Sequence, residues 1–330
     1  MVAVAAVSQG SLNAVYTRRS MRRRYEVWFV RFHLADGSGA WWFRYLLMNP
    51  GRDGCAGQAR GEPDSGEPAQ VWATWFPREG KPQTAIEGFP LAALELSERG
   101  ASPFYFRAGE NQMGEDGCSG RLEAEGLKVS WDLKWRSSFG ATVADWGWIG
   151  FSRTAHSDAA VSGSVSVNGR TFADEPLGFG LQGHNCGFRH RHQWNWTHCT
   201  LENFAGGVST FEALEYEIPL KLRVRRALLW HGGELFRFAD FEELSRDRER
   251  LLWVFKCRSS GRSAAATSAL VSVDGRGDSL HRLPYVKTDC SGTFEVANNS
   301  RARATIYFSR AGRPLEALST EGGAVLEMVG

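Results

Sequence analysis

The sequence lacks most of the features that assign a chain to a familiar functional class. It has no apolar run long enough to cross a membrane as a helix and no glycine-rich loop ending in Gly-Lys-Ser/Thr. It also has no Gly-x-Ser-x-Gly, and no Gly-x-Gly-x-x-Gly directly after a predicted strand. These absences argue against a transmembrane helix, a phosphate-loop nucleotidase, an α/β-hydrolase and a dinucleotide-binding domain. We expect no cofactor.

Cysteine and lysine are also scarce. The six cysteines form no Cys-x-x-Cys pair and are too few for a disulfide scaffold at this length, so reduced and mostly buried thiols are expected. Only six of the 39 basic residues are lysine, and from this bias we infer no function. The apolar opening, residues 1–7, is not preceded by a basic segment, which argues against a signal peptide and for a cytoplasmic protein.

The composition is that of an ordinary globular protein. Of the 330 residues, 42% are hydrophobic and 23% charged, and the formal net charge is +2. This charge gives no case for a nucleic-acid partner, and any membrane contact would be peripheral. At this length we expect two domains or one large unit of paired sheets. The oligomeric state is left open.

Tryptophan, by contrast, is abundant. The chain has 13 tryptophans, more than a core of this size needs. Large aromatic rings bury much area and attract cations, so an excess is typical of cavity walls. The alternative, two β-cores that happen to be rich in tryptophan, remains open at this point.

The pattern along the chain is that of short strands separated by turns. Aromatic and β-branched runs at 25–33 and 40–47 flank a turn, and two more hairpins are predicted around Asn168-Gly169 and Gly232-Gly233. Further strands are predicted at 71–76, 104–108, 120–125, 127–135, 252–257, 269–273, 292–297 and 305–309. Residues 50–69 are rich in Gly, Pro, Asp and Glu and are predicted to form a surface loop. The charged segment 241–252 is predicted to be a helix, with a charged hairpin as the alternative.

These elements favour an all-β fold made of two antiparallel β-barrel or sandwich domains. The boundaries we expect are a flexible basic leader at 1–24, an N-terminal β-domain at 25–173 and a C-terminal β-domain at 174–330. Five arginines cluster before the first strand and are interpreted as a solvated edge rather than a phosphate site: Arg18, Arg19, Arg22, Arg23 and Arg24.

The most unusual stretch joins a glycine-punctuated segment, Gly178–Gly187, to an alternating run at 188–199. We interpret the first part as a turn at the passage between the domains. In a strand, alternate side chains share a face, so one face would carry three histidines and two tryptophans. Its members are His190, Trp194, His192, Trp196 and His198, whereas Arg191 and Asn195 would point the other way.

Histidines at this spacing could hold a metal, together with His184. The nearest carboxylate is Glu202, which does not lie at a fixed short offset, and the adjacent tryptophans suggest an apolar face. We therefore expect no bound metal.

The segment 161–170, the turn 178–187 and the run Trp194-x-Trp196-x-His198 together resemble the signature of a lipocalin-like superfamily. It contains carotenoid 1,2-hydratase (hydroxyneurosporene synthase), the AttH-like proteins and tocopherol cyclase. The likeness covers most of the chain, but about 40 residues of it are specific. In the family's turn motif Gly183, His184, Asn185 and Gly187 match, and Cys186 stands where tryptophan is usual.

The resemblance implies two lipocalin-like domains and a cavity for an isoprenoid or polyketide-like hydrocarbon that is hydrated, cyclised or isomerised. Protonating an alkene needs an acid in a dry pocket, with aromatic faces around the resulting cation. The acid candidates are His184, Asp132 and Asp145, the last two beside tryptophans that would raise a carboxyl pKa by burial. The ligand-binding candidates are Asn185, Trp194, Trp196, His198, Trp131 and Trp42.

Three hypotheses follow. The first is a cofactor-independent hydratase or cyclase of a hydrophobic molecule, and the second is a non-catalytic carrier on the same fold. The third is a glycan-binding β-protein that uses exposed tryptophans as platforms. For His184 and Asn185 a structural role is the alternative, in which both side chains bond backbone groups to fix the turn.

Overall fold

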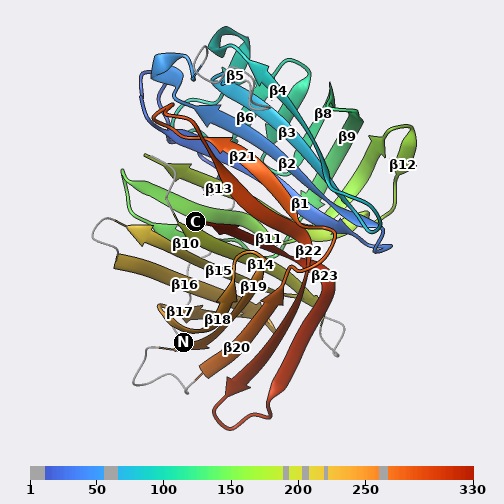
Figure 1. The fold of residues 1–330 in the computed structure, drawn as a ribbon, viewed down its shortest axis with the longest axis vertical. Helices are drawn as coiled ribbons and strands as arrows, with labels where there is room; N and C mark the ends of the chain where they lie inside the picture. Colours follow the sequence, from blue (N-terminus) through green and yellow to red (C-terminus); the bar gives the residue numbers. More distant parts are fainter. Residues whose placement is uncertain (1–11, 56–65, 189–192, 203–207, 219–221, 260–266) are drawn as a thin grey trace.

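The computed structural model describes residues 12–55, 66–188, 193–202, 208–218, 222–259 and 267–330. Antiparallel strands make up 67% of this part of the chain and form two sheets (Figure 1). The two helical elements with described bounds are single 3-10 turns, η1 (Pro50–Arg52) and η2 (Leu91–Ala93). The predicted all-β class with two lipocalin-like domains is confirmed.

The N-terminal sheet has 13 strands in the order β4-β3-β2-β1-β13-β11-β9-β8-β7-β6-β5, with β10 and β12 paired to β11. Because β4 also lies against β8 and β9, the sheet curls into a nearly closed barrel. Its strands are β1 (Tyr25–Leu34), β2 (Gly39–Met48), β3 (Ala69–Pro77), β4 (Gln83–Phe89), β5 (Leu94–Leu96), β6 (Tyr105–Ala108), β7 (Asn111–Gly114), β8 (Gly117–Ala124), β9 (Leu127–Arg136), β10 (Ala141–Asp145), β11 (Gly150–Val167), β12 (Arg170–Phe172) and β13 (Gly178–Gly187).

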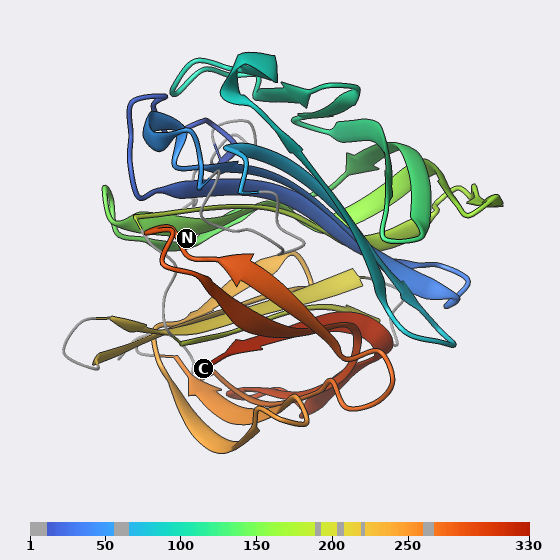
Figure 2. The ribbon, with the colours of Figure 1, turned by 45° about the horizontal axis from the view of Figure 1, so that its top comes forward.

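The C-terminal sheet has ten strands in the order β17-β16-β15-β14-β23-β22-β20-β19-β18, with β21 paired to β22. Figure 2 shows the two sheets stacked on one another, each with its own core. The strands are β14 (Trp194–Glu202), β15 (Val208–Ile218), β16 (Leu222–His231), β17 (Glu234–Phe238), β18 (Phe241–Asp247), β19 (Leu252–Arg258), β20 (Thr267–Asp274), β21 (His281–Val286), β22 (Thr293–Arg310) and β23 (Glu316–Val329).

The three predicted hairpins are present as β1–β2, β11–β12 and β16–β17. Asn168 and Gly169 both have positive φ, 47° and 86°, as the tight turn at that position requires. The strands predicted at 292–297 and 305–309 are parts of one long strand, β22.

The helix predicted at 241–252 is wrong, and the alternative hairpin is what forms. Phe241 on β18 and Trp253 and Phe255 on β19 are all buried in the C-terminal core. Their period-two burial outweighs the charge pairing that suggested a helix. That pairing persists in the hairpin, where Arg246 lies 3.2 Å from Glu243.

The segment Gly178–Gly187 is not a turn but strand β13, held between β1 and β11 in the middle of the N-terminal sheet. Its glycines allow close approach of neighbours rather than a change of direction. A Cβ on Gly180 would lie 1.9 Å from the Arg31 carbonyl oxygen, and one on Gly183 would lie 2.4 Å from the Phe29 ring. The N-terminal sheet therefore continues to Gly187, past the boundary expected near residue 173.

A disulfide joins Cys55, which follows η1, to Cys290 in the connection between β21 and β22. The expectation of six reduced thiols is wrong for this pair. The two residues are 235 positions apart, so no local spacing reveals that the domains bring them together. The other four cysteines are free and buried, as expected: Cys118, Cys186, Cys199 and Cys257.

The domains are also held together by Arg31 on β1, whose side chain is fully buried. Its guanidinium donates to the carbonyl oxygens of Gly323 at 3.0 Å and Ala324 at 2.8 Å, and to that of Ser300. Burial lowers the pKa of Arg31 to about 9. One arginine thus satisfies three carbonyls of β22 and β23 from the opposing domain.

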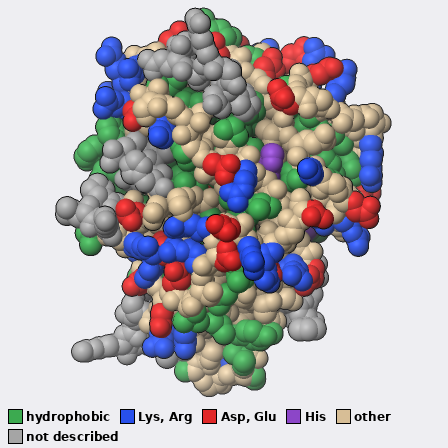
Figure 3. Space-filling view, in the orientation of Figure 1, with side chains coloured by type: hydrophobic (Ala, Val, Ile, Leu, Met, Phe, Trp, Pro, Cys, Tyr) green, Lys and Arg blue, Asp and Glu red, His purple; other side chains and the backbone are tan. Residues whose placement is uncertain are grey.

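Charge on the visible surface is mixed. Figure 3 shows basic and acidic side chains interspersed on this face, without a large patch of one sign. Within the described residues, no helix is long and apolar enough to cross a membrane.

Candidate functional site

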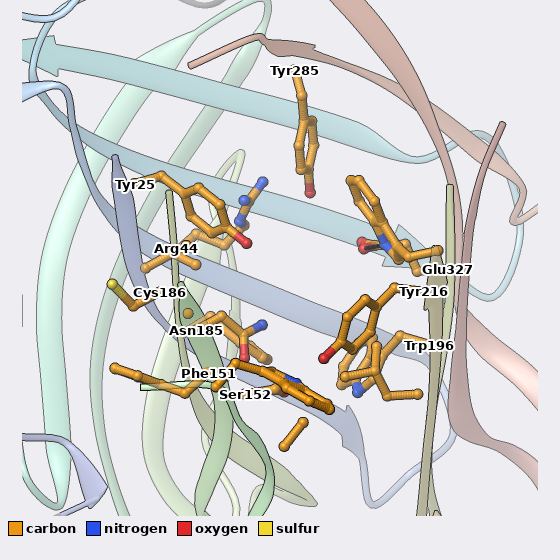
Figure 4. Close-up of a pocket in the computed structure, with 18 of the residues that line it drawn as sticks. Tyr25, Arg44, Phe151, Ser152, Asn185, Cys186, Trp196, Tyr216, Tyr285 and Glu327 are labelled. Atoms are coloured by element: carbon orange, nitrogen blue, oxygen red, sulfur yellow. Dashed lines mark hydrogen bonds between the residues drawn. The ribbon is translucent and has the colours of Figure 1, made fainter. Parts of the chain in front are cut away.

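A cavity of about 130 Å³ lies between the outer faces of the two sheets. Its N-terminal wall comes from β1, β2, β10, β11 and β13, and its C-terminal wall from β14, β15, β21 and β23 (Figure 4). The described lining is strongly aromatic, with Tyr25, Phe29, Trp42, Trp146, Phe151, Trp194, Trp196, Tyr216 and Tyr285. Trp146, which is 37% exposed, lies where the cavity meets solvent.

Successive side chains of a strand point to opposite faces of the sheet, and this alternation determines which of them reach the cavity. On β2, Trp42 and Arg44 line it, whereas Trp41, Phe43 and Tyr45 fill the interior of the N-terminal domain. Both faces of the strand are buried, one in the domain core and one at the domain interface. This arrangement explains much of the high tryptophan content, because aromatic side chains are needed on both faces.

Of the predicted row on β14, the structure describes Trp194, Trp196 and His198. Trp194 and Trp196 both line the cavity, and the Trp196 ring lies 5.8 Å from that of Phe29 across the interface. Asn195 points the other way and contacts Arg246 in the C-terminal domain. Arg191, His190 and His192 lie outside the described residues.

Glu327 on β23 supplies a carboxyl group on the cavity wall. The Trp194 indole donates to its Oε1 at 2.6 Å, and the Asn298 amide donates to its Oε2 at 3.4 Å. Burial raises the pKa of Glu327, while the charge of Arg44 and the two hydrogen bonds act in the opposite direction. This residue was not among the predicted acids, although the sequence carries one signal for it, a single acid among the apolar residues at the end of the chain.

Arg44 supplies a cation on the opposite wall and was not predicted either. Only 6% of the residue is exposed, and its guanidinium carbon lies 4.6 Å from the Trp72 ring centroid, 4.4 Å from that of Tyr285 and 5.3 Å from that of Trp42. Within the described part of the chain, its Nε and Nη1 have no hydrogen-bond partner.

A second buried carboxyl lies directly behind the wall. Glu212 on β15 accepts from the Trp196 indole at 2.9 Å and from the Thr154 hydroxyl at 2.7 Å. Burial raises the pKa of Glu212 to about 7. Because Thr154 is on β11, this carboxyl bridges the two domains.

His184 does not reach the cavity. Its side chain is fully buried inside the N-terminal domain and stacks on Trp28 with ring centroids 4.8 Å apart. Nδ1 donates to the Leu12 carbonyl oxygen at 2.7 Å, and Nε2 is hydrogen-bonded to Glu26 Oε1 at 2.9 Å. These contacts match the structural role that was the alternative for this residue, whereas the adjacent Asn185 does line the cavity.

Asp132 and Asp145 are both exposed, so the expectation that burial beside tryptophan makes them acids is wrong. On β9 the tryptophans point inward and Asp132 points outward, as period two requires. Asp145 forms an ion pair with Arg153 at 2.9 Å.

Trp131 fills the N-terminal core, where its indole donates to the Tyr45 hydroxyl at 3.0 Å, and is not part of the cavity.

His198 shares the interface face of β14 but lies outside the cavity. Burial lowers its pKa to about 3, so the ring is neutral, and Nε2 donates to the Ser157 carbonyl oxygen at 2.9 Å.

No group of three or more His, Cys, Asp or Glu side chains suited to a metal occurs among the described residues. With His190 and His192 undescribed, the absence of a metal stays a prediction.

Cys186 is the position at which the resembling family has tryptophan. The guanidinium of Arg24 donates to its sulfur at 3.2 Å, and burial raises the pKa of the thiol to about 12. The thiol therefore stays protonated and is a poor nucleophile.

Two stacked antiparallel β-domains with an aromatic cavity between them define the class of fold. No family model and no curated protein sequence matches the chain. Among solved structures, the crystal structure of CghA with Sch210972 is similar with a TM-score of 0.60 at 11% identity, covering 93% of this chain and 88% of that chain.

Two further structures share the fold. A putative AttH from Nitrosomonas europaea has a TM-score of 0.51 at 15% identity, covering 100% of this chain and 98% of that chain. Kievitone hydratase from Nectria haematococca has a TM-score of 0.54 at 11% identity, covering 98% of this chain and 95% of that chain. The chain thus shares its fold with these three proteins, one of them a putative AttH, as the resemblance predicted.

Proposed function

We propose that the protein binds a hydrophobic small molecule, of isoprenoid or polyketide type, between its domains and hydrates, cyclises or isomerises it by proton transfer. The observation that supports this most directly is Glu327, a buried carboxyl with a raised pKa on the wall of an aromatic cavity. Two similar structures, one named a hydratase and one solved with a small molecule, make the same fold a reasonable host for such chemistry.

In this proposal Glu327 is the general acid. Its proton is added to one carbon of an alkene, and the π electrons form the new C–H bond and leave a cation on the other carbon. Hydration follows when water attacks the cation and returns a proton to the Glu327 carboxylate, so the carboxyl is regenerated. Isomerisation or cyclisation ends instead with loss of a proton from the ligand to the same group. A raised pKa suits this role because it keeps the acid protonated nearer neutral pH.

The aromatic lining suits the cation that this chemistry creates. Trp42 and Trp196 approach at 6.4 Å between ring centroids, and Phe29 packs edge-on against both. The faces of such rings stabilise a cation by about 0.5–2 kcal/mol each, more when water is excluded. They also remove water that would trap the cation before it rearranges.

The size of the cavity limits the part of the ligand that is enclosed. Engineered apolar cavities of about 150 Å³ hold a molecule such as benzene. A cavity of about 130 Å³ therefore takes one ring or a short branched segment, and the remainder of a larger ligand extends past Trp146 into solvent.

The test compares Glu327→Gln with Glu321→Gln, an exposed acid on the same strand. Each protein is incubated in D2O with a panel of acyclic isoprenoids and polyene polyketides, and products are analysed by mass spectrometry for added water or exchanged deuterium. The native protein and Glu321→Gln should turn over at least one member, and Glu327→Gln should lose at least about 100-fold of that rate. Equal turnover by all three would refute the role of Glu327.

Binding of the same panel without turnover by any form would favour the carrier. The glycan hypothesis is less well supported, because Trp42 and Trp196 are buried between the domains and offer no open platform. Retention of immobilised oligosaccharides by the native protein would revive it.

A further inference from the structure

The Arg44 side chain is costly to bury in the environment that the structure gives it. A guanidinium loses strong hydration on burial, and this loss is usually offset by a carboxylate or by carbonyl oxygens. Arg31 shows the usual solution in the same protein, with three backbone carbonyls as acceptors. Arg44 forms no ion pair among the described residues, although its charge lowers the pKa of Glu327, and its Nε and Nη1 have no acceptor there.

Aromatic rings offset part of this cost but leave the hydrogen-bonding capacity unused. Trp72, Tyr285 and Trp42 lie against the guanidinium carbon at 4.4–5.3 Å from their centroids. Stacking holds the plane of the guanidinium in place, and its N–H groups point outward along that plane rather than toward the rings. The side chain is thus oriented by packing, and two of its three nitrogens, Nε and Nη1, have no acceptor within the described residues.

We infer that Arg44 is the recognition group for one oxyanion, such as a carboxylate or enolate, carried by the hydrophobic ligand. This inference deepens the proposed function and rests on it, because it places the acidic group of the ligand in the same cavity. Figure 4 shows Arg44 and Glu327 on opposing sides of the space between the domains. A ligand bound there would direct its oxyanion to the N-terminal wall and its reacting carbon toward the C-terminal wall.

The charges at the site favour an anionic over a neutral ligand. Glu327 lies on the opposite wall and forms no ion pair with Arg44 among the described residues, and burial raises the pKa of Glu327. An incoming oxyanion supplies the missing counter-charge and accepts two parallel N–H bonds from the guanidinium fork. For a ligand that carries an enolate, the same contact would hold the oxyanion while Glu327 gives its proton to the α-carbon; the C=C π electrons form the new C–H bond, the oxygen becomes the ketone carbonyl, and Glu327 is left as a carboxylate.

The test uses benzoate and benzamide, which share size and shape and differ in charge. Isothermal titration calorimetry of the full chain at neutral pH should show benzoate binding roughly 10- to 100-fold more tightly than benzamide, the range expected for a charge-assisted hydrogen bond. In Arg44→Met this preference should disappear, and in Arg44→Lys it should be partly kept. Arg107→Gln, which removes one exposed positive charge far from the cavity, should leave it unchanged.

Thermal stability separates recognition from a structural role. Because Arg44 lacks acceptors, Arg44→Met should be as stable as the native protein or more so. A fall in stability that parallels the loss of binding would overturn the inference.

Equal affinity for the two probes, or a preference that survives in Arg44→Met, would also overturn it. In that case the proposed hydrophobic ligand would still stand. If neither probe binds, the cavity does not receive a ring-sized ligand, and the proposed function fails together with the inference.

Discussion

Replacing Glu212 with glutamine should change how the stability of the protein depends on pH, by an amount that follows from the structure. The carboxyl is buried between the domains and accepts from Trp196 and Thr154. Its pKa of about 7 in the folded protein compares with 4.5 for the ordinary group, with burial as the main cause. Glu212→Gln keeps the shape and an acceptor oxygen but cannot ionise.

The direction of the effect follows from proton binding. Between pH 4.5 and about 7 the folded protein keeps a proton on Glu212 that the unfolded chain has released. The free energy of unfolding therefore falls as pH rises through this range, and the loss is complete above pH 7. A gap of about 2.5 pH units corresponds to about 3 kcal/mol. Glu212→Gln avoids this loss, so its stability relative to the native protein should rise by about 3 kcal/mol between pH 4 and pH 8.

Urea unfolding followed by tryptophan fluorescence, at intervals from pH 4 to pH 8, measures this difference. Glu242→Gln, at an exposed position on β18, controls for the removal of one acidic side chain. A difference between Glu212→Gln and native protein that stays constant across this range would refute the reasoning. So would a difference that falls with increasing pH.

Three further predictions concern the framework of the site. His184→Ala should lower the free energy of unfolding by about 1–3 kcal/mol, because buried Glu26 loses its hydrogen bond to His184 and keeps those from the backbone N–H groups of Tyr16 and Thr17. Any loss of ligand should match the loss of folded protein in thermal melts. Cys55→Ser should lower the free energy of unfolding by about 2–4 kcal/mol, and the intact mass of the native protein should show the bond to Cys290. Arg31→Met should lower the free energy of unfolding, because three buried carbonyls lose their donor; a urea midpoint equal to that of the native protein would contradict this.

The sequence predicted the fold because its signals are local. Turn residues such as Asn168-Gly169 and alternating burial in strands such as Leu127–Arg136 depend on neighbours a few positions away. The predictions failed where contacts between residues far apart in the sequence determine the local structure. The glycines of β13 look like a turn in the sequence, but in the structure they make room for Phe29 and for the backbone of β1.

The site was predicted only in part for the same reason. Trp194 and Trp196 were placed correctly because a period-two run fixes their shared face. Arg44 lies on a strand that is buried on both faces, so the pattern of hydrophobic residues does not show which side chains face the other domain. Glu327 is close to Arg44 only after the two domains have packed together.

The candidate site is divided between the two domains, so their relative position determines how a ligand can be held. Packed rings, including Trp28 and Trp131, fill the centre of the N-terminal domain. The aromatic cavity lies between the outer faces, where Arg44 comes from one domain and Glu327 from the other. Neither wall alone offers both a cation and an acid to one molecule. Contacts that fix the spacing of the domains therefore also fix the distance over which a ligand can be held at both ends.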